Sequence, residues 1–149
     1  MRRILVVDDD PQIGVAIRAW LKRHGFRVAI ADGGISGLSA LDNSTFDLMI
    51  VDIFMPNMRG FESIRVFHDH APSIPLIAIS GYAFSGPGAS NPDLPRMALR
   101  LGATRCLRKP FRADDVARRD RRMLVGGRTA SKTYCRNGRG YQRAVRTAG

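Results

Sequence analysis

Short apolar runs alternate along most of the chain with segments whose apolar residues recur every three or four positions. The runs are too short for helices and are rich in Val, Ile and Leu, which is typical of strands buried in a sheet. They predict five strands, at residues 4–7, 27–31, 46–51, 76–79 and 104–107.

The intervening segments have the 3.6-residue period of helices that cover a sheet. The first helix has the clearest start, because Asp10 fits an N-cap and Pro11 a first helical position, and it should end near Gly25. Four more helices are expected, marked by Ile35, Leu38 and Leu41, by Phe61, Ile64 and Phe67, by Leu94, Met97, Ala98 and Leu101, and by residues 113–124.

Strands that alternate with helices predict a parallel sheet covered on both faces, because crossover connections between parallel strands are right-handed. The fold class expected from the pattern is therefore α/β and doubly wound. In such a sheet the carboxyl ends of all strands meet at one edge, which is where these folds bind ligands.

Polar residues stand at four of these predicted strand ends. Asp8 and Asp9 follow the first strand, Asp52 the third, Ser80 the fourth and Lys109 the fifth. Carboxylates gathered in one pocket repel each other, so the cluster favours a cation, and hard oxygen ligands favour Mg²⁺. Such a pocket lets Asp52 act as a nucleophile toward phosphorus, with Lys109 and Ser80 contacting the phosphoryl oxygens.

Composition adds limits to this picture. The chain has 149 residues, 44% of them hydrophobic, and its length suits one domain with an extension. No apolar run is long enough to span a membrane and no signal peptide is legible at the start, so we expect a cytoplasmic protein. Two cysteines without metal-ligand spacing argue against a zinc site or a disulfide framework.

The net charge of +11 is concentrated near the end of the sequence. Residues 118–149 hold 10 of the 24 Lys and Arg residues and one of the 13 acids, a balance of +9, which leaves +2 for residues 1–117. From Gly126 the apolar period stops and glycines recur. We expect a domain at 1–124 and a basic, disordered extension at 125–149.

Four segments in order resemble the receiver domain of bacterial two-component response regulators. They are ILVVDDDP at the start, DLMIVDIFMP in the middle, PLIAISG in the fourth strand and KPF at 109–111. The resemblance covers residues 2 to about 124. It implies a flavodoxin-like three-layer (βα)₅ sandwich with strand order 2-1-3-4-5, which is the order given for the chemotaxis member of this family.

The resemblance also implies roles for individual residues. Asp8 and Asp9 match the acidic pair that holds Mg²⁺, Asp52 the phosphoacceptor, Ser80 the switch hydroxyl and Lys109 the lysine of the site. Phe54 matches the position whose backbone carbonyl contacts the metal. The bond between Lys109 and Pro110 matches one that is cis in the family.

Three departures from the family pattern bear on signalling. Cys106 occupies the position, three before Lys109, where receivers usually carry an aromatic switch residue. The span from Ser80 to Lys109, 29 positions, is long for the family, with the excess in SGPGASNP. Phe54 and Tyr82 are bulky at positions beside the phosphoacceptor, and we expect them to slow hydrolysis of the aspartyl phosphate.

The function expected from these features is a stand-alone receiver, not an enzyme acting on a separate substrate. It would take phosphate from a histidine kinase or phosphotransfer protein, promote its own phosphorylation and dephosphorylation, and signal through contact with an unknown output protein as a monomer or weak homodimer. A DNA-binding regulator that uses the basic extension is the alternative, although no nucleic-acid signature is legible there. A phosphatase is disfavoured because Phe54 stands where that class typically has a second acid.

Overall fold

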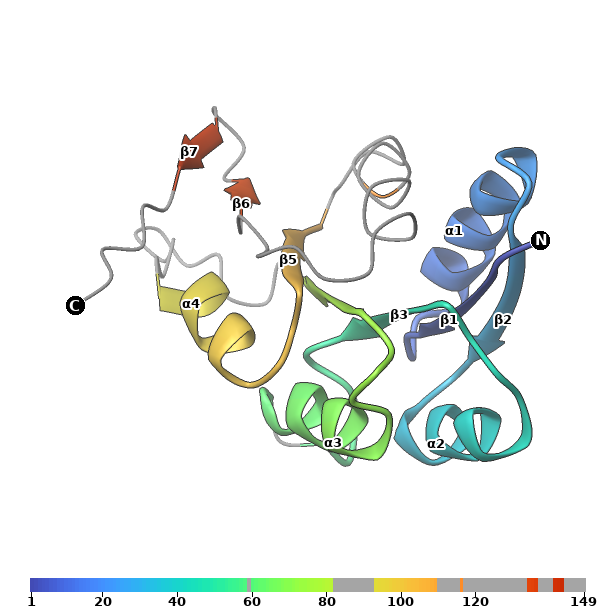
Figure 1. Ribbon diagram of the computed structural model, residues 1–149, viewed down its shortest axis with the longest axis horizontal. Helices are drawn as coiled ribbons and strands as arrows, with labels where there is room; N and C mark the ends of the chain where they lie inside the picture. Colours follow the sequence, from blue (N-terminus) through green and yellow to red (C-terminus); the bar gives the residue numbers. More distant parts are fainter. Residues whose placement is uncertain (59, 82–92, 110–115, 117–133, 137–140, 144–149) are drawn as a thin grey trace.

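The computed structural model describes residues 1–149 except 59, 82–92, 110–115, 117–133, 137–140 and 144–149. Within these residues, five parallel strands and four helices alternate up to residue 108, and Figure 1 shows how they are arranged. They are β1 (Arg3–Val7), α1 (Pro11–Arg23), β2 (Arg27–Ala31), α2 (Gly34–Asn43), β3 (Leu48–Asp52), α3 (Glu62–His70), β4 (Leu76–Ser80), α4 (Asp93–Arg100) and β5 (Arg105–Arg108). The strand order β2-β1-β3-β4-β5 confirms the predicted doubly wound, flavodoxin-like sheet.

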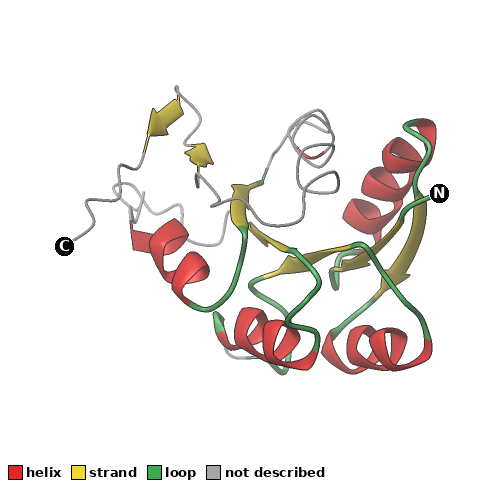
Figure 2. Ribbon diagram, viewed as in Figure 1, coloured by secondary structure: helices red, strands yellow, loops and turns green. Residues whose placement is uncertain are grey.

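The sheet separates two apolar cores because successive side chains of a strand point to opposite faces. Met49 belongs to the core shared with α2, α3 and α4, whereas its neighbour Ile50 belongs to the core shared with α1. Figure 2 shows the same layering, with α1 on one side of the sheet and α2 and α3 on the other. All residues of β3 and β4 are buried, which explains their continuous apolar sequences.

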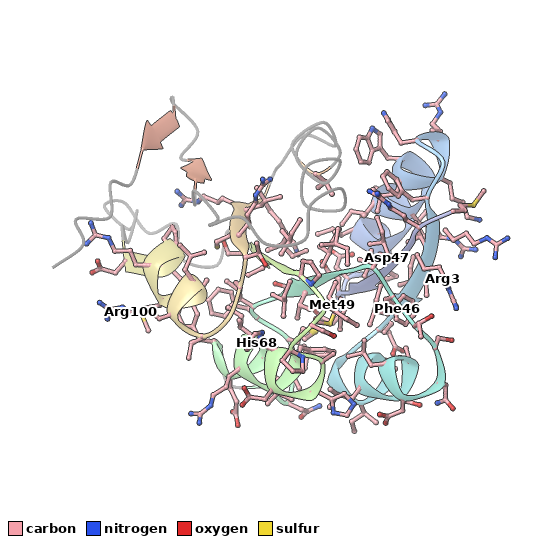
Figure 3. The ribbon with its side chains drawn as sticks, viewed as in Figure 1. Arg3, Phe46, Asp47, Met49, His68 and Arg100 are labelled. Carbon is pink, nitrogen blue, oxygen red and sulfur yellow. The ribbon has the colours of Figure 1, made fainter. Side chains whose placement is uncertain are left out.

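The register between β1 and β3 is fixed at the amino end of the sheet, where Figure 3 labels Arg3, Phe46 and Asp47. The Arg3 backbone N–H donates to the Asp47 carboxylate at 2.7 Å, and the Asp47 N–H donates to the Arg3 carbonyl at 2.8 Å. The Arg3 guanidinium lies 5.1 Å from the centre of the Phe46 ring, within the range of a cation–π interaction. A one-residue slip would break all three contacts.

The structure confirms the predicted start of α1. The Asp10 side chain accepts a hydrogen bond from the Gln12 N–H at 2.9 Å, and Pro11 opens the helix. The strand limits differ by one or two residues from those expected: Phe46 precedes β3, and Asp52 and Ser80 are the last residues of their strands. The two polar side chains are therefore held by the sheet itself.

Two residues expected on the apolar faces of helices are exposed. Ile35, in the first turn of α2, is 89% exposed, and Met97 of α4 is 42% exposed. The apolar period predicted a wider buried face on both helices than the structure has. The helices pack against the core through Leu38, Leu41 and Ala98 instead. Of the predicted helix at 113–124, only Val116 lies within the described residues, and it is helical and buried.

Part of the region expected to be disordered contains secondary structure. β6 (Tyr134–Arg136) and β7 (Tyr141–Arg143) pair in antiparallel register, while the predicted domain boundary and disordered extension stay predictions. The four residues between them include Gly138 and Gly140, and strands separated by three to five residues that contain glycine are a hairpin signal in sequence. Among the described residues, no helix combines the length and apolar character that a membrane crossing requires.

Gly37, in the middle of α2, provides a test of the packing between α2 and α3. A Cβ atom at this position would lie 2.7 and 2.9 Å from ring atoms of Phe67 and 3.0 Å from a methyl group of Val7. Helix propensity favours alanine by about 1 kcal/mol, but crowding in a rigid core costs about 1 to 3 kcal/mol. We expect Gly37→Ala to lower the free energy of unfolding by about 1 kcal/mol, measured by urea denaturation.

The matched control is Ser39→Ala on the exposed side of α2, where the same helix gains propensity without crowding. This variant should be neutral or slightly stabilised. A gain in stability for Gly37→Ala equal to that of Ser39→Ala would contradict the close packing described here.

Candidate functional site

The sheet brings polar side chains from three strands to its carboxyl edge. Asp8 directly follows β1, Asp52 ends β3, and Lys109 directly follows β5. The Lys109 amino group donates to Asp8 Oδ2 at 2.9 Å and to Asp52 Oδ2 at 3.2 Å. These ion pairs join residues that are 101 and 57 positions apart in the sequence, so the fold is what assembles the site.

The site is largely withdrawn from water. Asp8 is 1% and Asp52 4% exposed, and the Lys109 side chain is 13% exposed. Each buried acid also accepts a backbone hydrogen bond on its other oxygen: the Asp10 N–H donates to Asp8 at 2.9 Å and the Phe54 N–H to Asp52 at 3.2 Å. Both carboxylates are therefore held in fixed orientations, with one oxygen of each toward the lysine.

Burial and charge act in opposite directions on Asp52. Burial raises the pKa of its carboxyl above the ordinary value of 3.8, and the negative charge of Asp8 adds to this, while Lys109 and the Phe54 N–H lower it by a smaller amount. For Lys109, burial lowers the pKa of the amino group, but the hydrogen bond to Asp8 and the charges of Asp52 and Asp8 together raise it above 10.5. The lysine is therefore charged, but its charge does not offset the effect of burial on the Asp52 carboxylate.

Carboxylate oxygens of Asp8, Asp9 and Asp52 lie within 4.8 Å of one another. Asp8 and Asp52 are buried and Asp9 is exposed, so solvent reaches the cluster at Asp9. Three hard oxygen donors beside a single lysine leave negative charge in excess. This donor set fits Mg²⁺, which binds through a few carboxylates and keeps several waters.

The loop that follows Asp52 leads into α3 and is closed by aromatic packing. The Phe54 and Phe61 rings meet edge to face, with their centres 6.4 Å apart. Between them the backbone turns at Asn57, whose φ of 66° lies in the left-handed region that asparagine tolerates, and at Gly60, whose φ is 47°. The side chain of Phe54, expected beside the phosphoacceptor, is therefore held against the start of α3.

The remaining predicted site residues are placed as follows. Ser80 is buried at the end of β4, and its carbonyl accepts a hydrogen bond from the Lys109 N–H at 2.8 Å. Cys106 is 6% exposed and packs with Ala98 and Ala103, as expected of a small buried residue. Tyr82, Pro110 and the residues 85–92 (SGPGASNP) fall outside the described residues.

Ser63, in the first turn of α3, is a buried polar residue that the sequence analysis did not single out. It is 0% exposed, and its hydroxyl lies 3.3 Å from the carbonyl oxygens of both Asp52 and Ile53. It also lies 3.1 Å from the carbonyl of Gly60. The available signal was a serine on the helix side that Ile64 and Phe67 mark as apolar, which predicts a buried hydroxyl with a backbone partner.

The chain was compared with known families and proteins. The family model described as the response regulator receiver domain matches residues 4–119. The receiver protein CpdR of Brucella abortus is 32% identical over 127 residues, which cover 84% of this chain and 98% of that protein. The transcriptional regulatory protein ZraR of Klebsiella oxytoca is 36% identical over 113 residues, which cover 76% of this chain and 24% of that protein.

The match to the first four curated relatives spans only 24% to 57% of their lengths, so it concerns a part of those proteins. Among solved structures, the CheY-like receiver domain protein from Methanospirillum hungatei is 31% identical with a TM-score of 0.70, over 83% of this chain and 94% of that one. A receiver domain protein from Clostridium thermocellum gives a TM-score of 0.72 at 26% identity over the same shares.

The family match covers more than half of the chain, and the two solved receiver domain proteins superpose on it with TM-scores of 0.70 and 0.72. Sequence, fold and the cluster of Asp8, Asp52 and Lys109 agree. The chain belongs to the response regulator receiver domain family.

Proposed function

We propose that the protein is a phosphorylation-dependent signalling switch in which Asp52 accepts a phosphoryl group from a histidine kinase or a phosphotransfer protein. The observation that carries this proposal is the ion-paired cluster at the carboxyl edge of the sheet, where the Lys109 amino group lies 2.9 Å from Asp8 and 3.2 Å from Asp52. A buried acid at this edge has no evident structural need, because β3 is already held by two neighbouring strands.

The chemistry follows from the positions of these groups. A carboxylate oxygen of Asp52 attacks the phosphorus atom, a P–O bond forms, and the bond from phosphorus to the donor breaks. The donor leaves with the electron pair of that bond and takes a proton. Charge develops on the phosphoryl oxygens, and Lys109 is placed to stabilise it.

We further propose that Asp8, Asp9 and Asp52, with the backbone carbonyl of Phe54, hold Mg²⁺. When bound, the ion neutralises the carboxylates and the phosphoryl oxygens. The excess of negative charge among the described residues supports this, since the cluster has three acids and the lysine pairs with two of them. The phosphoryl group then adds its own charge to the same pocket, which strengthens the need for a cation.

Output by contact with another protein is the second part of the proposal. The match to CpdR extends over 98% of a protein named as a receiver, so a receiver can make up nearly a whole protein of this family. A cytoplasmic location suits such a partner. The net charge of +9 in residues 118–149 supports the alternative of direct DNA binding, and several relatives carry the name of transcriptional regulators.

The phosphoacceptor can be tested with a small acyl phosphate. Wild-type protein incubated with Mg²⁺ and acetyl phosphate should gain one phosphoryl group, measured by intact mass, whereas Asp52→Asn should gain none because an amide is not a nucleophile toward phosphorus. Asp69→Asn, an exposed acid of α3, is the matched control and should be labelled as the wild type is. Equal labelling of the Asp52→Asn variant would refute Asp52 as the acceptor.

The uncompensated charge of Asp52 predicts that its removal stabilises the protein without metal. Because burial raises the pKa of Asp52 in the folded state, folding is opposed once pH rises above the value at which this carboxyl ionises in the unfolded chain. At pH 7 with a chelator, Asp52→Asn should raise the free energy of unfolding by about 0.5 to 2 kcal/mol.

The gain should shrink as pH falls toward the ordinary value of 3.8, because the charge that opposes folding is progressively lost by protonation. Adding Mg²⁺ should stabilise the wild type more than the variant, because the variant lacks one proposed ligand. Urea denaturation at pH 7 and at pH 4.5, with and without Mg²⁺, measures both effects. A destabilised Asp52→Asn at pH 7 would contradict the charge balance described here.

The aromatic side chain after the phosphoacceptor predicts a long-lived phosphoform. Phe54 and Phe61 pack together at the start of the loop after Asp52, and we propose that Phe54, with Tyr82, restricts water at the phosphoryl group. Phe54→Ala should shorten the half-life of phosphorylated protein several-fold without changing the amount of label at saturation. The half-life is measured by intact mass after removal of the donor, and loss of the wild-type label within seconds would argue against shielding.

A further inference from the structure

Ser63 forms the most direct link between α3 and the strand end that carries the phosphoacceptor. Its side chain is fully buried, and its hydroxyl approaches the carbonyl oxygens of Asp52 and Ile53 at 3.3 Å. The two carbonyls belong to the residue that accepts the phosphoryl group and to the next one. The distance in sequence is 11 and 10 positions, so this contact is made by the tertiary fold.

The same hydroxyl reaches the end of the loop. It lies 3.1 Å from the carbonyl oxygen of Gly60, three residues earlier, where the chain enters α3. A hydroxyl has one proton to donate, so it shares that proton among three acceptors or alternates between them. Either way, one buried donor ties both ends of the loop 53–60 together.

Among the described residues at the start of α3, the N-cap position lacks a side-chain cap. The N-cap position is Phe61, which makes no side-chain cap hydrogen bond, and its ring is used against Phe54. The Ser63 hydroxyl donates to carbonyl oxygens, whereas the free N–H groups at the start of a helix need acceptors. Ser63 therefore does not act as a helix cap. Its contacts are directed to the backbone of the phosphoacceptor loop.

From these contacts we infer that Ser63 is a positioning residue for the phosphoacceptor site, and this inference rests on the proposed function. By holding the Asp52 and Ile53 carbonyls, its hydroxyl fixes the direction in which the chain leaves β3. The Asp52 carboxylate and the backbone of Phe54, whose N–H donates to that carboxylate at 3.2 Å, depend on this direction. Groups that orient metal ligands typically contribute about 10-fold to 100-fold to metal affinity or activity.

The test compares Ser63→Ala with Ser39→Ala, which makes the same chemical change on the exposed side of α2. Mg²⁺ affinity is measured by calorimetric titration of the metal alone, and the phosphorylation rate by intact mass with acetyl phosphate. We expect Ser63→Ala to weaken Mg²⁺ binding and to slow phosphorylation, each by about 10-fold, and Ser39→Ala to match the wild type.

Ser63→Cys keeps the shape of the side chain and a weaker S–H donor, so it should fall between the wild type and Ser63→Ala. It also replaces the alanine variant if that variant does not fold. A Mg²⁺ dissociation constant and a rate within about threefold of the wild type in Ser63→Ala, or indistinguishable from the wild type in Ser63→Cys if Ser63→Ala does not fold, would overturn the inference and leave the proposed function intact. A wild type that accepts no phosphate would instead refute the proposed function.

Discussion

The charge balance at the carboxyl edge of the sheet is the constraint on which the site depends. Two buried carboxylates stand on adjacent central strands, where their mutual repulsion is strongest because water is largely excluded. One lysine, delivered from the opposite side of β4, holds them together. One lysine does not neutralise all the carboxylates, so the site keeps an excess of negative charge. A bound cation would balance this excess.

The sheet brings these polar groups together because the packing of its apolar strands fixes where each strand ends. β3 and β4 are buried on both faces, so apolar packing fixes their position, and the polar residues occupy only their ends. The functional groups are thereby separated from the groups that stabilise the fold. A change at Asp52 alters charge while leaving the two apolar cores untouched.

The sequence predicted the fold and the convergence of Asp8, Asp52 and Lys109 because topology alone determines where strand ends meet. The apolar side of α3 indicates that Ser63 is buried, but the sequence does not say which carbonyl oxygens its hydroxyl meets, because these belong to the strand end and loop packed against the helix. The exposure of Ile35 and Met97 also escaped prediction, because an apolar period does not say how far a helix extends past its sheet. The pairing of β6 with β7 also escaped prediction, because each strand has only three residues, too few to show an alternating pattern.

The sheet order has a consequence for how the site can respond. The two acids follow or end strands with a partner on each side, whereas β5 is an edge strand of its sheet and pairs only with β4 among the described strands. Lys109 is tied to that partner by its own N–H to the Ser80 carbonyl at 2.8 Å. The anionic half of the site is thus held by central strands and the cationic half by an edge strand, so a group that entered between them would meet less resistance from the side of Lys109.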